Sequence, residues 1–393
     1  MKKEFLNLGK QPIANGFLYE EDISDEFFFD LRVVFDEDTK LVSLKDFVKP
    51  ELMFNDDYVY VSSMSQTMRE HFQDASSKFK SNFAPQKVLE IGSNDGVFVK
   101  NFDPENTIAV EPCGNFAKLT NKQGYHTYSN FWNTALSNQI VQDHGKQDLI
   151  FSANCMCHVQ DLEDAFLAIS NCLSDNGVFV FEDPSLEKMI SRNSYDQIYD
   201  EHAHIFSVIA LDNILSEQGL QIFDVENLSV HGGSNRIYVK KIGNTSLTVK
   251  RSVFENIKLE RESGLDKFER FVKFADSVKQ SKEELLFLLK KYKDQNKKIV
   301  SYGATSKSTT VFNYCGITSE HIDYIVDTTP HKQGKLSPGT HIPVISPEDG
   351  FDELVDVAFL GAWNFTKEIV SKEKEFLERG GKFITHVPKV SVL

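Results

Sequence analysis

From residue 86 onward the chain alternates short apolar runs with amphipathic stretches. The runs KVLEIG, TIAVEP, DLIFSAN and GVFVFED are separated by segments with helical spacing, such as DLEDAFLAISNCLSDNG. This alternation is typical of a parallel sheet covered by helices. A second alternation begins at KKIVSYGATSKSTTVFNYCGI and continues through HIDYIVD, IPVISPED, VDVAFLGAW and GKFITHVP. We therefore predict an α/β chain with two doubly wound domains, of which the second is smaller.

The residues before 86 and those between the two alternations have other secondary-structure patterns. DLRVVFDEDTKLVSL predicts a β-hairpin around the turn 36–40, and residues 65–82 have helical spacing. LQIFDVENLSVHGGSNRIYVKKI predicts two long antiparallel strands, and a charged helical stretch follows. The predicted organisation is a small irregular N-terminal lobe (1–70), a central domain (71–250), a connecting helical segment (251–296) and a C-terminal Rossmann-like domain (297–393).

Composition excludes several classes of function. The net charge of −15 argues against a general nucleic-acid binder, since phosphate contacts need clustered Lys and Arg. The N-terminus lacks a signal-peptide pattern, and no run of about 18 apolar residues predicts a membrane span. Five scattered cysteines are typical of reduced thiols. We expect a cytoplasmic protein without a bound metal, either a monomer or a small homo-oligomer.

The strand-turn VLEIGSNDG has the features of a cofactor cradle. Glu90 ends an apolar run, and Gly92 and Gly96 flank a tight turn in which the backbone can approach a ligand. The turn lacks the G-x-G-x-x-G of dinucleotide sites, and its E-x-G-x-x-x-G spacing resembles that of S-adenosylmethionine (SAM) methyltransferases. The alternative is that both glycines only turn the chain.

Later strand ends supply the other expected cofactor contacts. Glu111 lies about twenty residues after the cradle, where a carboxylate can accept both ribose hydroxyls. The full predicted cofactor-binding set is Glu90, Gly92, Asn94, Asp95, Gly96, Glu111, Pro112, Asn130, Phe131, Asn154 and His158. In this set Asn130 and Phe131 are placed to face adenine.

The segment YDQIYDEHAHIFS concentrates proton-handling side chains within ten positions. Tyr199 and His202 are three residues apart and share a face if the segment is helical. Glu201 adjoins His202 and can orient its ring or raise its basicity. We predict a functional role for His202 and Tyr199, whereas His204 fits better as a buried structural histidine.

Three further loops carry polar groups suited to an oxygen-rich ligand. HGGSNRIYV follows a strand, and YGATSKSTT and VDTTPHKQGKLSPGTHIP follow two strands of the second alternation. Loops at the carboxyl ends of neighbouring parallel strands form diphosphate or nucleotide pockets. The predicted substrate-binding residues are Tyr195, His231, Arg236, Tyr302, Ser306, Lys307, Asp327, His331, Lys332 and His341.

These motifs together resemble the C-methyltransferases that act on nucleotide-linked deoxysugars. The resemblance includes LGKQPIANGF, MFNDDYVYVSSMS and LEIGSNDG as well as the segments quoted above, and it extends over nearly the whole chain. It implies SAM as cofactor, a zinc-binding N-terminal lobe, a SAM-binding central domain and a C-terminal domain for the nucleotide sugar. It further implies that His202 removes the C3 proton of a 4-keto sugar, assisted by Tyr199 and Glu201, so that the enediolate carbon attacks the methyl group.

The sequence departs from this family at two places. The cysteine pairs expected for zinc are missing, with Phe35 and Asp38 where two of them would fall. We therefore predict no zinc and a lobe held together by its aromatic residues. Asp200 stands where the family usually has a histidine, which changes the charge beside the predicted base.

Two other functions remain open at this point. The chain is either a SAM-dependent O- or N-methyltransferase of a sugar or small molecule, or a non-enzymatic sensor that kept the fold. Tyr199, Glu201 and His202 beside an intact LEIGSNDG argue against the sensor. Exchange of a substrate C–H proton without methyl donor would exclude O- or N-transfer.

Overall fold

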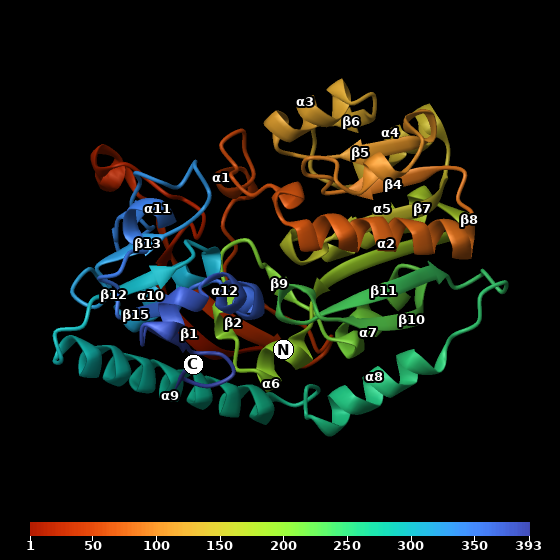
Figure 1. Cartoon of the computed structure of the whole chain (residues 1–393). Helices are drawn as coiled ribbons and strands as arrows, with labels where there is room; N and C mark the ends of the chain where they lie inside the picture. The colour runs from red at the N-terminus through yellow and green to blue at the C-terminus, as the bar shows by residue number, and fades with distance from the viewer.

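Three β-sheets organise the chain (Figure 1), and the computed structural model describes all of residues 1–393. The central sheet has seven strands in the order β10-β11-β8-β7-β4-β5-β6. Its strands are β4 (Val88–Ile91), β5 (Thr107–Val110), β6 (His126–Tyr128), β7 (Gln147–Ala153), β8 (Leu173–Pro184), β10 (Leu220–Leu228) and β11 (Ser234–Lys241). Strands β4 to β8 are parallel, while β11 runs antiparallel to both neighbours. The predicted parallel sheet and its antiparallel finish are both confirmed.

Helices cover both faces of this sheet because its strands are apolar on both sides. They are α2 (Gln66–Phe83), α3 (Gly114–Lys122), α4 (Thr134–His144), α5 (Leu162–Cys172) and α7 (Val208–Glu217), with the shorter α6 (Leu186–Ser191) beyond the end of β8. Helix α2 confirms the helical spacing of 65–82. Ser65 caps it by accepting the backbone N–H of Met68, and Phe79 of its buried face packs against Phe151 of β7 at 5.5 Å.

The N-terminal sheet has the order β1-β2-β3-β9 and is antiparallel throughout. Its strands are β1 (Lys2–Pro12), β2 (Phe28–Asp36), β3 (Val42–Leu44) and β9 (His204–Ile205). Strands β2 and β3 form the predicted hairpin, with Phe35 opposite Val42. The short helix α1 (Pro50–Met53) follows it. Strand β9 lies within the acid–base segment, so this segment supplies the last strand of the N-terminal sheet.

The C-terminal sheet has the order β14-β13-β12-β15-β16-β17 and is parallel except for β17. Its strands are β12 (Ile299–Tyr302), β13 (Tyr324–Val326), β14 (Val344–Ile345), β15 (Val357–Leu360), β16 (Lys382–Thr385) and β17 (Ser391–Val392). The accompanying helices are α10 (Ser306–Cys315), α11 (Pro347–Gly350), α12 (Thr366–Lys372) and α13 (Lys374–Glu378). The expected second doubly wound unit is therefore present.

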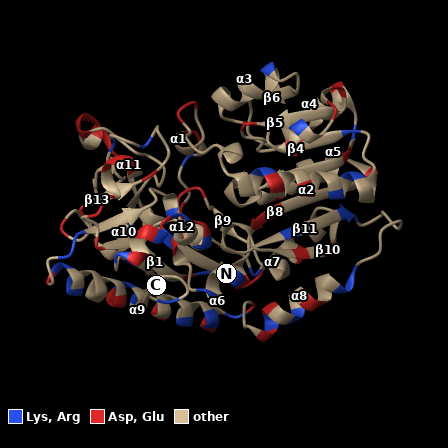
Figure 2. Ribbon diagram, in the orientation of Figure 1, with Lys and Arg blue, Asp and Glu red and all other residues tan.

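The charged stretch after β11 forms two helices, α8 (Arg251–Glu262) and α9 (Phe268–Lys293). Lys/Arg and Asp/Glu are interspersed along both (Figure 2), including the i,i+4 pairs Arg251–Glu255 and Lys290–Asp294. Helix α9 buries an apolar stripe, and its Phe271 packs against Phe5 at 5.0 Å and Phe35 at 4.6 Å. The N-terminal sheet thus packs against α9.

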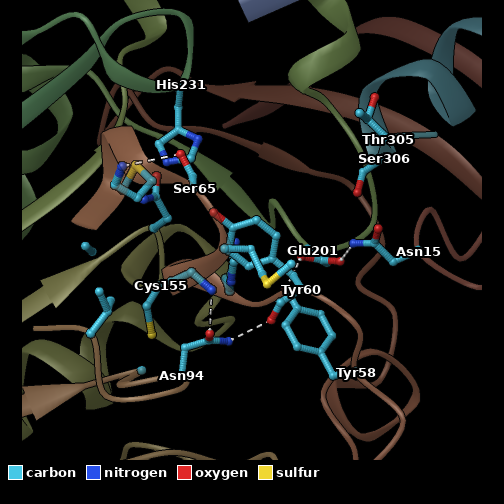
Figure 3. A pocket seen from close by; sticks show the side chains of 18 of the residues that line it. Asn15, Tyr58, Tyr60, Ser65, Asn94, Cys155, Glu201, His231, Thr305 and Ser306 are labelled. Atoms are coloured by element: carbon cyan, nitrogen blue, oxygen red, sulfur yellow. Dashed lines mark hydrogen bonds between the residues drawn. The ribbon is translucent and has the colours of Figure 1, made fainter. Parts of the chain in front are cut away.

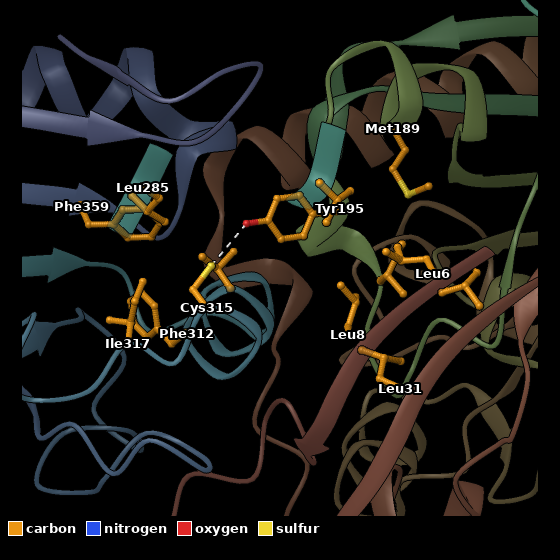
Figure 4. Packing of buried hydrophobic residues seen from close by; sticks show 14 of the residues in the cluster. Leu6, Leu8, Leu31, Met189, Tyr195, Leu285, Phe312, Cys315, Ile317 and Phe359 are labelled. Atoms are coloured by element: carbon orange, nitrogen blue, oxygen red, sulfur yellow. Dashed lines mark hydrogen bonds between the residues drawn. The ribbon is translucent and has the colours of Figure 1, made fainter. Parts of the chain in front are cut away.

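One hydrophobic core joins the N-terminal sheet, α9 and the C-terminal sheet (Figure 4). Leu8 and Leu31 from the first sheet belong to the same cluster as Phe312 and Phe359 from the last. The aromatic side chains of the lobe therefore pack into a core shared with the end of the chain.

Of the predicted domain boundaries, 70/71 falls inside α2, 250/251 falls at the start of α8 and 296/297 falls just before β12. The division itself stays a prediction. None of the helices combines the length and apolar character that crossing a bilayer requires.

Candidate functional site

A cavity of about 790 Å³ lies between the central sheet and the C-terminal sheet (Figure 3). Its walls come from the carboxyl ends of the central strands, from the acid–base segment after α6, from residues before α2 and from loops of the C-terminal sheet. The predicted site residues that line it are Glu90, Gly92, Asn94, Glu111, Pro112, Asn130, Phe131, Asn154, His158, Tyr199, Glu201, His202, His231, Tyr302, Ser306, Lys307, Asp327 and Lys332. A single cavity thus brings together most of the predicted cofactor, acid–base and substrate residues.

The turn after β4 leaves no room for a side chain at Gly92. Gly92 has φ of +75°, and a Cβ atom there would lie 2.7 Å from Cys155 Sγ. Any side chain at Gly92 would therefore collide, and the positive φ would strain the backbone as well. Glu90 at the end of β4 is buried and accepts the backbone N–H of Val99 at 3.2 Å, while burial raises its pKa.

Glu111 after β5 faces the cavity with its carboxylate already oriented. Its Oε2 accepts the N–H of Asn94 at 2.7 Å, and its Oε1 accepts the N–H of Cys113 at 2.9 Å. A carboxylate has about four acceptor positions, so two remain for a diol such as a ribose. A buried carboxylate with free acceptor positions beside the Gly92 turn fits the ribose of the methyl donor expected from the sequence.

A segment before α2 lies against the cradle. The Asn94 side chain donates to the Tyr60 carbonyl at 3.0 Å and accepts the N–H of Ser62 at 2.9 Å (Figure 3). Asn94 therefore holds residues 60–62 at the cavity, a contact that sequence reasoning did not anticipate.

The acid–base segment has a defined hydrogen-bond geometry. It is a 3-10 turn at Tyr195–Gln197 followed by a tight turn rather than an α-helix. Tyr199 and His202 still meet, with the hydroxyl 2.8 Å from Nε2. His202 Nδ1 lies 2.6 Å from the Gln197 carbonyl, which can only accept. Nδ1 therefore carries the hydrogen, and the lone pair of Nε2 is left on the side of Tyr199.

The surroundings keep His202 neutral. Burial lowers its pKa well below the usual value, and the nearby His158 and Lys307 lower it further. The His158 ring stacks on the His202 ring at 5.3 Å, and burial lowers the pKa of His158 to about 4. A neutral imidazole is the form that can accept a proton.

Glu201 is fixed by groups from the start of the chain. Its Oε1 accepts from Asn15 Nδ2 at 2.6 Å, and its Oε2 accepts from the Tyr58 hydroxyl at 3.1 Å. Behind it, Asp200 Oδ1 accepts the N–H of Ala14 at 3.0 Å. Burial raises the pKa of both carboxyls, and the charge of Glu201 raises that of Asp200 further. Asn15 and Tyr58 line the cavity and were missed by sequence reasoning.

Two lysines of the C-terminal loops face the same cavity. Burial lowers the pKa of both Lys307 and Lys332, while the carboxylates near them raise it. Lys332 also donates to the Ala304 carbonyl at 2.7 Å. These lysines place two ammonium groups in a cavity that the carboxyl groups of Glu111, Glu201 and Asp327 also line.

Several predicted site residues lie outside the cavity, and their roles need correction. Tyr195 is fully buried in the shared core, with its hydroxyl 3.8 Å from Cys315 Sγ (Figure 4). Arg236 donates to Glu182 at 2.6 Å and to Glu226 at 3.2 Å, which occupies its guanidinium inside the central domain. His341 pairs with Glu26 at 2.7 Å.

Three more predicted site residues also do not line the cavity. His331 is exposed, and neither Asp95 nor Gly96 in the turn after β4 lines the cavity. A Cβ atom at Gly96 would meet Thr120 Cγ2 at 2.9 Å, so this glycine serves packing against α3. His204 lies in β9, 3.2 Å from the Gln160 carbonyl, in agreement with a structural role.

Cys157, His158 and His202 place three potential metal-ligand atoms within 4.8 Å of one another. Both ring nitrogens of His202 are already hydrogen-bonded, one to a carbonyl and one to a hydroxyl. The arrangement therefore suits proton transfer, and we assign no metal ligand to it. Residues 1–54 contain neither cysteine nor histidine, so the N-terminal lobe does not offer the ligands of a structural zinc site.

Comparison with known proteins agrees with this geometry. A C-methyltransferase C-terminal domain model matches residues 229–388, a methyltransferase domain model matches 60–225, and a model for a zinc-binding domain matches 1–54. C-methyltransferase NovU of Streptomyces niveus is 29% identical over 396 residues, which cover 99% of this chain and 94% of NovU.

Solved structures with detectable similarity include a SAM-dependent methyltransferase from Clostridium acetobutylicum and the N-methyltransferase NodS from Bradyrhizobium japonicum. The first is 17% identical with a TM-score of 0.35, covering 44% of this chain and 92% of its own. The second is 15% identical with a TM-score of 0.34, covering 44% and 95%. Together the family models extend over nearly the whole chain, which is a SAM-dependent methyltransferase whose C-terminal part matches the C-methyltransferase model.

Proposed function

We propose that this enzyme methylates carbon 3 of a nucleotide-linked 4-keto-deoxysugar, with His202 as the base. The observation that carries the proposal is the tautomer of His202. Its Nδ1 hydrogen is committed to the Gln197 carbonyl, so Nε2 is the basic atom, and the residue lines the same cavity as the cradle at Gly92. A carbon nucleophile needs such a base, because a C–H bond must first lose its proton.

The ketone in the proposed substrate explains how an imidazole suffices. The proton on the carbon beside a carbonyl is acidified, because its electron pair can move onto the carbonyl oxygen as an enolate. In our proposal His202 Nε2 takes this proton, displacing the hydroxyl of Tyr199. When bound, SAM supplies an electrophilic methyl group. The chain's own part is to hold the enolate carbon in line with that group and to exclude water.

The C-terminal loops are proposed to bind the nucleotide diphosphate. Lys307 in the first turn of α10 and Lys332 after β13 line the cavity, and a diphosphate satisfies such paired cations. Tyr302, Ser306 and Asp327 line the same wall. Asp327 also accepts the N–H of Ala304 at 2.7 Å, which ties the two loops together.

The proposal is tested by incubating the enzyme with labelled SAM and a panel of nucleotide-linked keto-sugars. We expect the label on C3, located by NMR, and we expect exchange of the C3 proton with solvent in the absence of SAM. Label on a sugar oxygen without such exchange would contradict the proposal and would favour an O-methyltransferase.

Replacement of the base gives the corresponding prediction. His202→Gln should reduce methyl transfer by at least 100-fold, a loss typical of removing a general base, and should abolish C3 exchange. Affinity for S-adenosylhomocysteine, measured by calorimetry, should change less than twofold, because the Gly92 and Glu111 contacts are untouched. Near-normal turnover in this variant would show that another group is the base.

A further inference from the structure

The loop after β1 extends from the N-terminal lobe into the wall of the cavity. Asn15 lines the cavity and donates to Glu201 Oε1 at 2.6 Å (Figure 3). The residue before it, Ala14, donates its N–H to Asp200 Oδ1 at 3.0 Å. Two consecutive residues of the lobe therefore hold two consecutive residues of the acid–base segment, across 186 positions of sequence.

The same loop is fixed on its other side by α10. The Ala14 carbonyl accepts from Thr309 Oγ1 at 3.0 Å, and the neighbouring Thr310 donates from Oγ1 to the Ile198 carbonyl at 3.1 Å. The ring of Phe17 lies under Lys332 Nζ at 4.8 Å. The loop is therefore held between the acid–base segment and the C-terminal loops, and it has little freedom to turn Asn15 away.

Glu201 depends on the start of the chain for its hydrogen bonds. Its side chain is buried, and the donors to its two oxygens are Asn15 and Tyr58, both from residues before α2. A buried carboxylate beside a second carboxyl is costly unless such donors satisfy it. Asn15 therefore stabilises the Glu201 carboxylate with a neutral amide donor.

We propose that Asn15 is a positioning residue of the methyl transfer reaction, which fixes Glu201 beside His202, and that the N-terminal lobe thereby completes the active site. This inference rests on the proposed role of the acid–base segment. It gives the lobe a function in the reaction that does not depend on a metal. It also gives Asp200 a role, since its carboxyl anchors the backbone that presents Asn15.

The test compares Asn15→Leu, which removes the donor at similar volume, with Asn15→Gln, which keeps it on a longer arm. We expect kcat of Asn15→Leu to fall at least tenfold, with KM for SAM changed less than twofold and partial recovery of kcat in Asn15→Gln. Loss of the donor hydrogen bond raises the pKa of Glu201, so the acid limb of the kcat–pH profile should move to higher pH. The control Asn7→Leu, on an exposed position of β1, should leave kcat unchanged.

A second measurement does not require turnover. The Glu201 carboxyl is followed by ¹³C NMR and assigned by its disappearance in Glu201→Gln; its titration should shift to higher pH in Asn15→Leu. A folded Asn15→Leu enzyme with wild-type kcat at every pH, or with unshifted Glu201 titration, would overturn the inference. If no keto-sugar nucleotide is methylated by the wild type while the titration does shift, the coupling of Asn15 to Glu201 is supported and only the proposed substrate is wrong.

Discussion

At the scale of single residues, hydrogen-bond geometry determines which atoms of the acid–base segment can react. The Gln197 carbonyl sets the His202 tautomer, and burial removes the charged form of the ring. Two other histidines that line the cavity share this property, since burial lowers the pKa values of His158 and His231 to about 4. The histidines of the cavity wall are therefore neutral bases rather than cations.

This environment gives the pH dependence a definite sign. The base must be neutral to act, and burial lowers the His202 pKa below 6.5, so activity should persist as pH falls through 6.5 and be lost only at lower pH. We expect the acid limb of kcat/KM, measured with C3-deuterated substrate to isolate proton removal, to lie below pH 6. An acid limb above pH 7 would contradict the assignment of this limb to His202.

At the scale of elements, the turn that links β4 to the following segment is the one that we propose to hold the cofactor. Its backbone is pinned by the bond from the Gly92 N–H to the Val110 carbonyl at 2.8 Å, and Cys155 closes the space above it. A glycine is required there for two separate reasons, the left-handed backbone and the close approach of the thiol.

Gly92→Ala should therefore weaken binding of S-adenosylhomocysteine at least tenfold, as measured by calorimetry. The matched control is Gly219→Ala, which has φ of +71° but nothing within 4 Å of the added Cβ. Both variants carry a backbone cost of about 1 kcal/mol, and only the first should lose ligand. Equal affinities in the two variants would show that the Gly92 turn does not hold the ligand.

Sequence patterns predicted the elements much better than they predicted contacts between elements. The hairpin at β2–β3, the helix α2 and the parallel strands follow from local periodicity, and each is observed. Asn15 and Tyr58 were missed because they reach Glu201 from 186 and 143 positions away, and no local pattern records such a contact. Arg236 was misassigned for the same reason, since its partner Glu182 lies 54 positions away.

At the scale of the whole molecule, the first and last parts of the chain share one core, with α9 between them. This packing provides the aromatic support that the sequence predicted for a lobe without zinc cysteines. Phe271 is central to it, since it is fully buried and contacts both Phe5 and Phe35.

Phe271→Ala should destabilise the protein by about 3–5 kcal/mol, the usual cost of deleting a buried phenylalanine side chain. Phe287→Ala on the same helix is the control, because that ring is 73% exposed and its loss should change stability by about 0.5 kcal/mol or less. Urea unfolding measures both. A small effect of Phe271→Ala would show that the lobe is held mainly by its contacts around the cavity.

The pairing of β9 with β3 limits how this protein can be engineered. A protein that contained only the middle of the chain would lack β3, so His204 and Ile205 of β9 would have no neighbouring strand. An unpaired strand edge promotes aggregation between molecules. Such a fragment would also lack Asn15 and Tyr58, the two hydrogen-bond donors to Glu201. A shortened form of this enzyme must therefore keep about the first sixty residues, or replace the strand pairing and the hydrogen-bond donors that they provide.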